Sequence, residues 1–261
     1  HQCDRRQRQM CIRDSFCAIL DDDTIKCWGD GSNGKLGTGS TSDKNVPTST
    51  SGAFATGRYA VAIDAGYEHT CAILDNGELK CWGWDNYGQL GDGGSNTNIN
   101  APSSTAIDLG TGRTAVAVSA GASHTCVILD NGDVKCWGWD NYGQLGDGGP
   151  LWNSNNPTDT NAPSSTAIDL GSGRTAVAVS AGYYHTCAIL DNGDLKCWGS
   201  DQYGQLGDGG SAVSINSPSS TAIDLGTGRT AVAVSAGLYH TCAILDNGDL
   251  KCWGSDSYGQ L

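Results

Sequence analysis

The chain has 261 residues and a formal net charge of −13, with 38 glycines and 12 cysteines. Because so negative a chain repels other polyanions, its charge argues against generic nucleic-acid binding. No run of 18 apolar residues is present, so we expect no membrane-spanning segment.

The first 14 residues match nothing later in the chain and contain four arginines in the stretch RRQRQMCIRD. Residues 5–15 resemble the translation of an adapter used in sequencing libraries. We therefore expect residues 1–14 to be an artefactual or disordered leader that takes no part in the fold. The alternative is a basic N-terminal arm.

From Ser15 to the end, one unit of about 55 residues recurs. Its most constant segment, HTCAILDNGELKCWG, begins at His69 and returns at residues 124, 185 and 240, with a degenerate copy at residue 15. The last copy is truncated. A period of this length is too long for most helical solenoids and is typical of a propeller blade.

Every segment of a unit has the character of a strand or a turn. Residues 114–121 (TAVAVSAG) predict a strand with no polar alternation, which we expect to be buried on both faces. Residues 124–129 and 133–137 predict a hairpin around Asp130–Gly132, since Asn-Gly accepts positive φ. A fourth, outer strand is expected around residues 166–170. Four antiparallel strands per unit, repeated radially, predict an all-β fold, the β-propeller.

The recurring WG-x-[DNS]-x-Y-GQLG-x-G, followed by AV-x-V-SAG-x-x-HT-C-A-[IV]-L, resembles the repeat of the regulator of chromosome condensation family across residues 15–261. The resemblance implies a seven-bladed ring, which needs about 385 residues at this period. We therefore expect an incomplete fragment of four to five blades, whose remaining blades belong to the same longer chain. The paired cysteines suggest a bacterial, secreted branch of the family.

Two known roles of that family fit this sequence poorly. Nucleotide exchange on a small GTPase, with chromatin binding, conflicts with the acidity and the paired cysteines. Ultraviolet-B reception in a plant member uses tryptophans just before the His-Thr pair. The matching dipeptides here are Tyr67-Glu68, Ala122-Ser123, Tyr183-Tyr184 and Leu238-Tyr239, with no tryptophan.

Ten cysteines occur as pairs ten residues apart. A three-residue turn at Asp75–Gly77 would place Ile73 opposite Leu79 and Cys71 opposite Cys81, close enough for a bond. We predict five disulfides: Cys17–Cys27, Cys71–Cys81, Cys126–Cys136, Cys187–Cys197 and Cys242–Cys252.

Five disulfides imply an oxidising compartment, so we expect an extracellular, cell-surface or periplasmic protein. Two alternatives stay open for the sulfur atoms. His69, Cys71 and Cys81 could supply three ligands of a zinc site. The cysteines could also be free, buried thiols that pack as small apolar groups.

No asymmetric catalytic cluster is visible, because each candidate group recurs once per unit. The histidines at 69, 124, 185 and 240 begin buried strands, and we expect them to hydrogen-bond backbone or neighbouring-blade groups. The loop from Asp85 to Asp92 is rich in oxygen but lacks the closing glutamate of a calcium loop. We predict no enzyme activity and no cofactor, with calcium left open.

The units differ mainly at aromatic positions, in the dipeptide before His-Thr, after Trp-Gly, and in an insertion near residue 152. Variable aromatic loops on constant strands are typical of a binding face, and neutral drift is the alternative. The candidate ligand-binding residues are Tyr67, Glu68, Trp84, Trp139, Trp152, Tyr183, Tyr184 and Tyr239. The tryptophans of the Trp-Gly pairs recur in every unit, so we expect them in the core between blades.

These features together predict a non-catalytic binding scaffold, secreted or displayed on the cell surface, that recognises an unknown protein or glycan. A purely structural repeat array, serving as a spacer or fibre module, is the main alternative. A metal-dependent hydrolase comes last. Binding is favoured if the variable aromatic residues lie on one exposed face, and disfavoured if they are buried between blades.

Overall fold

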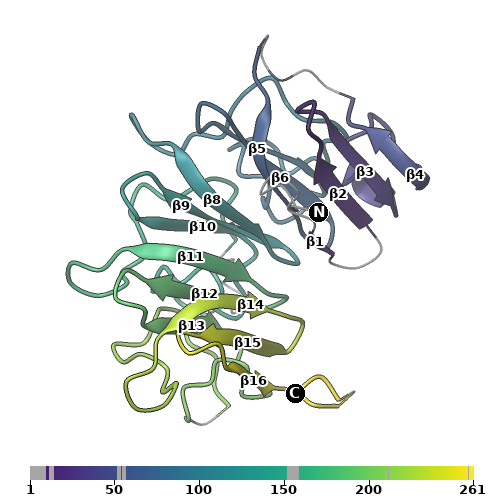
Figure 1. Ribbon diagram of the computed structural model, residues 1–261. Helices are drawn as coiled ribbons and strands as arrows, with labels where there is room; N and C mark the ends of the chain where they lie inside the picture. Colours follow the sequence, from purple (N-terminus) through teal and green to yellow (C-terminus); the bar gives the residue numbers. More distant parts are fainter. Residues whose placement is uncertain are drawn as a thin grey trace.

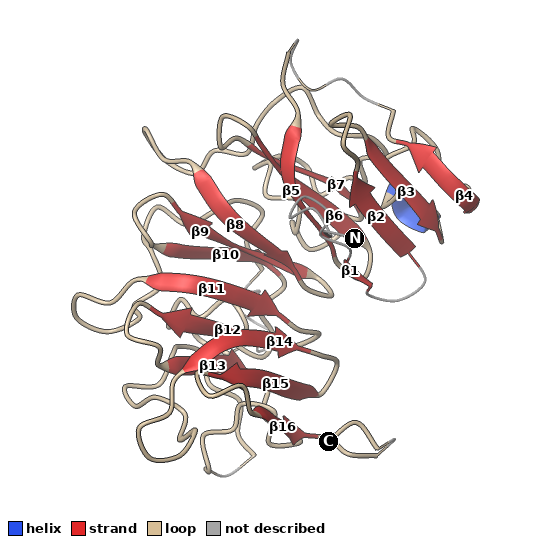
Figure 2. Ribbon diagram, viewed as in Figure 1, coloured by secondary structure: helices blue, strands red, loops and turns tan. Residues whose placement is uncertain are grey.

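The structure is a computed structural model that describes residues 10–11, 15–51, 54, 57–151, 159–210, 212–257 and 259–261. Within these ranges five antiparallel sheets follow one another along an arc (Figures 1 and 2). The described residues contain a single helical element, the 3₁₀ turn η1 (Ser32–Gly34). No helix there is long and apolar enough to span a membrane. The predicted all-β class is confirmed.

We call the sheets blades 1 to 5. Blade 1 contains β1 (Met10–Cys11), β2 (Ser15–Ile19), β3 (Ile25–Gly29) and β4 (Lys44–Ser49). Blade 2 contains β5 (Ala60–Ala65), β6 (His69–Leu74) and β7 (Leu79–Gly83). Blade 3 contains β8 (Ala115–Ala120), β9 (His124–Leu129) and β10 (Val134–Gly138).

Blade 4 contains β11 (Ala176–Ala181), β12 (His185–Leu190) and β13 (Leu195–Gly199). Blade 5 contains β14 (Ala231–Ala236), β15 (His240–Leu245) and β16 (Leu250–Gly254). Each of blades 2 to 5 is a three-stranded meander rather than the predicted four-stranded blade. The described residues form five blades, which agrees with the four to five expected, and not a seven-bladed ring. Of the expected leader, Met10–Cys11 pairs with β2, and the rest lies outside the described residues.

The hairpin between β6 and β7 has the predicted register. Ile73 pairs with Leu79 and Cys71 pairs with Cys81, and Gly77 closes the turn at a φ of 79°. The Cα atoms of the paired cysteines are 4.0 to 4.1 Å apart in all five hairpins, and all five predicted disulfides are formed. These bonds leave none of the ten cysteines for zinc or as a free thiol.

The prediction of a fourth strand around residues 166–170 is wrong, because the structure has no strand there. That segment bonds to β10 through the amide of Ile168, which donates to the carbonyl of Val134 (2.9 Å). Two residues further on, the carbonyl of Leu170 accepts from the ammonium of Lys196 in blade 4 (3.0 Å). The segment therefore crosses from one blade to the next, and it cannot continue a ladder along either.

The inner strands are also not buried on both faces. In β8 the register shifts between Ala115 and Ala117, so that Val116 is a bulge residue with no partner on β9. A bulge turns the extra side chain out of the sheet, and Val116 is 59% exposed. The same shift occurs in β5, β11 and β14.

The core lies between the blades. One cluster joins Ile73 and Leu79 of blade 2 with Leu129 and Trp137 of blade 3. The indole nitrogen of Trp137 donates to the carbonyl of Gln89 in the preceding segment (3.0 Å). Trp82 and Trp198 are equally buried and make the corresponding bonds, so the recurring tryptophans of blades 2 to 4 are inter-blade core, as expected. Trp28 and Trp253, in the first and last blades, are only partly buried.

Candidate functional site

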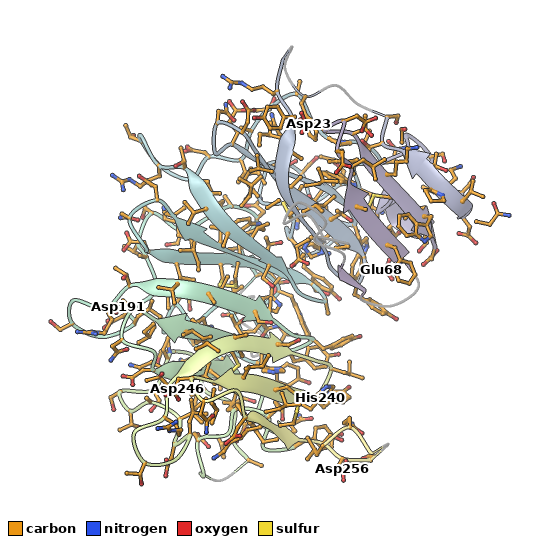
Figure 3. All side chains as sticks on the ribbon, in the orientation of Figure 1. Asp23, Glu68, Asp191, His240, Asp246 and Asp256 are labelled. Carbon is orange, nitrogen blue, oxygen red and sulfur yellow. A yellow bond between two sulfur atoms is a disulfide. The ribbon has the colours of Figure 1, made fainter. Side chains whose placement is uncertain are left out.

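The two variable positions of each unit lie side by side at one end of the blade. The amide of Trp84 donates to the carbonyl of Glu68 (2.9 Å), and that of Trp139 donates to the carbonyl of Ser123 (2.8 Å). The hairpin turns lie at the other end. Figure 3 shows Asp246 at the turn that follows β15 and His240 at the start of that strand. Variable side chains of successive blades are therefore presented at a common end.

Aromatic rings from four blades form a continuous surface at this end. Ring centroids of Trp139 and Tyr184 are 5.0 Å apart, and those of Tyr183 and Tyr184 are 4.2 Å apart. Tyr67 of blade 2 and Tyr183 of blade 4 meet at 5.7 Å, above blade 3. We call this set the aromatic face; it comprises Tyr67, Trp84, Tyr87, Trp139, Tyr142, Tyr183, Tyr184, Tyr203 and Tyr239.

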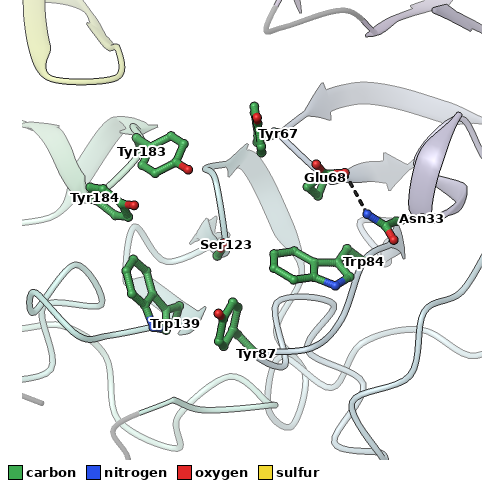
Figure 4. A pocket seen from close by; sticks show the side chains of 9 residues that line it. All are labelled: Asn33, Tyr67, Glu68, Trp84, Tyr87, Ser123, Trp139, Tyr183 and Tyr184. Atoms are coloured by element: carbon green, nitrogen blue, oxygen red, sulfur yellow. Dashed lines mark hydrogen bonds between the residues drawn. The ribbon is translucent and has the colours of Figure 1, made fainter. Parts of the chain in front are cut away.

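A cavity of about 210 Å³ opens within the aromatic face. Ser123 of blade 3 lines it where blades 4 and 5 carry Tyr184 and Tyr239. The small residue leaves the space that rings from both neighbouring blades then enclose (Figure 4). The cavity is thus a consequence of one unit differing from the others.

Six of the eight candidate ligand-binding residues line this cavity: Tyr67, Glu68, Trp84, Trp139, Tyr183 and Tyr184. Tyr239 lies beside it, with its ring 6.2 Å from that of Tyr184. Trp152 lies outside the described residues. The structure therefore brings together seven residues that the sequence comparison between units selected.

A charged corner closes the cavity on the side of blade 1. Lys35, which replaces the glutamine of GQLG in the first unit, is buried, and its ammonium lies 2.6 Å from Asp30 Oδ2 and 3.2 Å from Glu68 Oε2. Asn33 Nδ2 also donates to Glu68 Oε2 (3.0 Å). These bonds hold the Glu68 carboxylate at the edge of the cavity (Figure 4).

The pKa values at this end follow from burial and pairing. Burial alone would raise the pKa of Asp30, but hydrogen bonds from Lys35 and Ser32 lower it to about 2. Burial opposes the charge on Lys35, yet its bonds to Asp30 and Glu68 raise its pKa. Burial, followed by the bond to Tyr183, raises the pKa of Tyr184. The Tyr184 phenol is therefore neutral at neutral pH.

Three tyrosines of the aromatic face were not predicted as site residues. Tyr87, Tyr142 and Tyr203 occupy the same position of the constant loop, where each amide donates to a glutamine side chain two residues on. These tyrosines are the same in every unit after the first, so a comparison between units does not select them as binding residues. The sequence signal that could have found them is their position, three residues after the variable tryptophans.

The oxygen-rich loop has a structural role. The Asp85 carboxylate accepts the amide of Leu90 (2.9 Å), and the carboxylates of Asp140 and Asp201 make the same bond in their own blades. Among the described residues, no group of three or more His, Cys, Asp or Glu side chains could hold a metal ion. The side chains facing the cavity can stack, donate and accept hydrogen bonds, and attract positive charge.

Comparison with known proteins now identifies the repeat. The sequence profile of the RCC1-like domain matches residues 2–261. The chain belongs to the RCC1-like domain family. The resemblance drawn from the repeat motifs is thereby confirmed.

Individual relatives of this RCC1-like chain are longer than it is. It is 32% identical over 257 residues to the ultraviolet-B receptor UVR8 of Arabidopsis thaliana, covering 98% of the chain and 54% of the receptor. It is 30% identical over 243 residues to the E3 ubiquitin-protein ligase HERC2 of Homo sapiens, covering 93% of the chain and 5% of the ligase. The chain thus spans about half the length of the plant relative and a small part of the human one.

The fold of this RCC1-like chain also matches solved structures. Human WBSCR16 superimposes with a TM-score of 0.79 at 20% identity, covering 95% of this chain and 62% of that one. At this identity the match establishes the propeller fold alone.

Proposed function

We propose that this RCC1-like chain is a non-catalytic scaffold that holds a protein or glycan partner on its aromatic face. The observation that carries the proposal is the convergence of variable residues from three blades on one cavity, lined by Tyr67, Trp84 and Trp139 among others. The repeat already places equivalent positions at one end, and neutral drift gives no reason for so many of these positions to carry large rings.

The physical properties of the aromatic face suit binding. The rings of Trp84, Trp139 and Tyr184 are partly buried, so each is held by its neighbours while part of its surface remains exposed. Tyrosine and tryptophan lose little conformational entropy on contact and offer large apolar areas with a polar edge. The blades beneath are stapled by disulfides, which gives the loops a rigid base.

The proposed location outside the cytosol rests on the disulfides. Cys71–Cys81, Cys126–Cys136 and Cys187–Cys197 are each buried between neighbouring blades. Disulfides persist mainly in oxidising compartments, which supports a secreted, cell-surface or periplasmic protein.

The proposal can be tested with substitutions that introduce, in one unit, the residue that other units carry at the same position. Ser123→Tyr places in blade 3 the residue that blades 4 and 5 carry, and should fill the cavity. Trp84→Ser and Trp139→Ser place there the residue of blades 4 and 5 after Trp-Gly. All three variants should keep the wild-type melting temperature and lose binding to the peptides and glycans that an array shows to bind the wild type.

Tyr59 is the control, because it is 40% exposed and its carbonyl accepts from Asp75 at the hairpin end. Tyr59→Ser should keep full binding. Undiminished binding by the three variants, or no binding of the wild type to either array, would contradict the proposal.

A further inference from the structure

Resting on the proposed function, we propose that the cavity of the aromatic face binds an organic cation, the ammonium or guanidinium group of a basic side chain presented by a protein partner. Two features carry this inference. The wall is built almost entirely of aromatic rings, and the gap in that wall holds a carboxylate.

Six aromatic rings line the cavity one after another, from Trp84 to Tyr67 (Figure 4). Successive centroids along this wall lie 5.2, 5.8, 5.0, 4.2 and 5.7 Å apart in the order Trp84, Tyr87, Trp139, Tyr184, Tyr183 and Tyr67. A cation is attracted to an aromatic face within about 6 Å of the ring centroid, and aromatic cages recognise ammonium groups in this way. Several rings of this wall could contact one bound cation at once.

Glu68 closes the wall between Tyr67 and Trp84. Together with Asp30 and Lys35 it forms a group of two carboxylates and one ammonium, which leaves one negative charge in excess. The Lys35 ammonium is buried beneath the site and does not line the cavity. That ammonium lies 5.9 Å from the Tyr67 centroid, so the protein already places one cation against this wall.

The same lining suits a sugar less well. Apart from the phenol and indole groups, its polar side chains are those of Asn33, Glu68 and Ser123, and the first two already bond to each other. A sugar ring needs several hydrogen-bonding groups around its edge, whereas a cation needs only π faces and a negative charge. The formal net charge of −13 also attracts a basic partner from a distance.

Short peptides test the charge requirement directly. The peptides are Ac-Gly-Xaa-Gly-amide with Xaa as lysine, trimethyl-lysine, arginine or the neutral norleucine, and methyl glucoside represents sugars. Titration followed by tryptophan fluorescence should show at least one cationic peptide binding about fivefold or more tightly than the norleucine peptide, the discrimination expected of a desolvated cation–π contact.

Two substitutions of opposite sign sharpen this test. Glu68→Gln removes the negative charge and should lower the affinity for the cationic peptides several-fold. Lys35→Gln introduces the glutamine that later units carry at this position, as Gln89 and Gln144. It removes the ammonium that competes for Glu68, so the cationic peptides should bind more tightly. Trp139→Ser should lower the affinity for the cationic peptides about tenfold. Tyr59→Ser should leave this affinity unchanged. Melting temperatures show which variants remain folded.

The outcomes separate this inference from the proposed function. Equal binding of the norleucine peptide, or tighter binding of methyl glucoside that Trp139→Ser abolishes, would overturn the cation inference while leaving a working binding face. No binding of any peptide would overturn it as well, and the array experiment would then decide the proposed function by itself.

Discussion

The Nε2 atom of His124 lies 2.9 Å from the hydroxyl oxygen of Thr186 in the next blade. That hydroxyl donates its own proton to the carbonyl of Gln144 (2.8 Å), so the imidazole must be the donor to Thr186. His69 and His185 make the corresponding contacts at 2.8 Å with the threonines at 125 and 241. The histidines join consecutive blades, as the sequence led us to expect.

We predict that His124→Gln lowers the free energy of unfolding at pH 7 by about 1–3 kcal/mol, because a buried hydrogen bond between blades is lost. Burial, with a smaller effect from the histidines at 69 and 185, lowers the pKa of His124 to about 3. The unfolded chain therefore takes up a proton below pH 6.5 that the native state refuses, so stability falls as the pH drops from 6.5 to 3.

The variant should show a shallower decline over that range, measured by urea unfolding at several pH values. His240→Gln is the control, since the ring of His240 in blade 5 is only partly buried, and it should change stability little. Identical pH slopes for the wild type and His124→Gln would contradict this prediction.

Asp64 gives the opposite dependence on pH. Its carboxylate accepts the amide of Ala120 (2.8 Å), where Ser119 and Ser180 accept the equivalent amides in the following blades. Burial raises the pKa of Asp64 to about 6. The native state therefore binds this proton more tightly than the unfolded chain, and stability is lost as the pH rises from about 4 through 6.

Asp64→Ser should stabilise the protein at pH 7 by about 1–3 kcal/mol and have little effect below pH 4. Thermal unfolding at pH 4 and pH 7 measures the difference. Equal effects at both pH values would show that Asp64 is not protonated preferentially in the native state.

The five disulfides determine how many cysteines can be alkylated, which mass spectrometry of the intact protein measures. Alkylation without a reductant should label at most the two remaining cysteines, Cys3 and Cys11, whereas all 12 react after reduction and unfolding. Replacing Cys126 and Cys136 together by alanine should cost about 2–3 kcal/mol, because it frees the loop of the unfolded hairpin. Labelling of more than two cysteines in the native protein would contradict the proposed extracellular location.

Two glycines at one repeat position separate backbone strain from packing. Gly88 and Gly204 have φ values of 77° and 74°. A Cβ at Gly88 would collide with Asn161 of the next unit, whereas one at Gly204 would meet nothing within 4 Å. Gly204→Ala should cost about 1–2 kcal/mol from strain alone, and Gly88→Ala about 1–3 kcal/mol more. Equal costs in denaturant titrations would show that the loop moves freely.

The local structure of each blade could be read from its residues. Asp75–Gly77 defines a three-residue turn, and counting outward from it pairs Cys71 with Cys81, because the register of a hairpin depends only on its turn. The variable aromatic positions were also visible, since nearly identical units provide their own comparison.

Other features depended on neighbours distant in sequence. The sequence around Ile168 and Leu170 predicts a strand. In the structure, however, its backbone groups hydrogen-bond to two different blades, blade 3 at Ile168 and blade 4 at Leu170. The cavity likewise required the tertiary structure, because Tyr67 and Tyr183 meet only once blades 2 and 4 are packed on either side of blade 3. Side-chain patterns within one unit determine pairing and burial, whereas the angle at which rigid blades pack decides which loops meet.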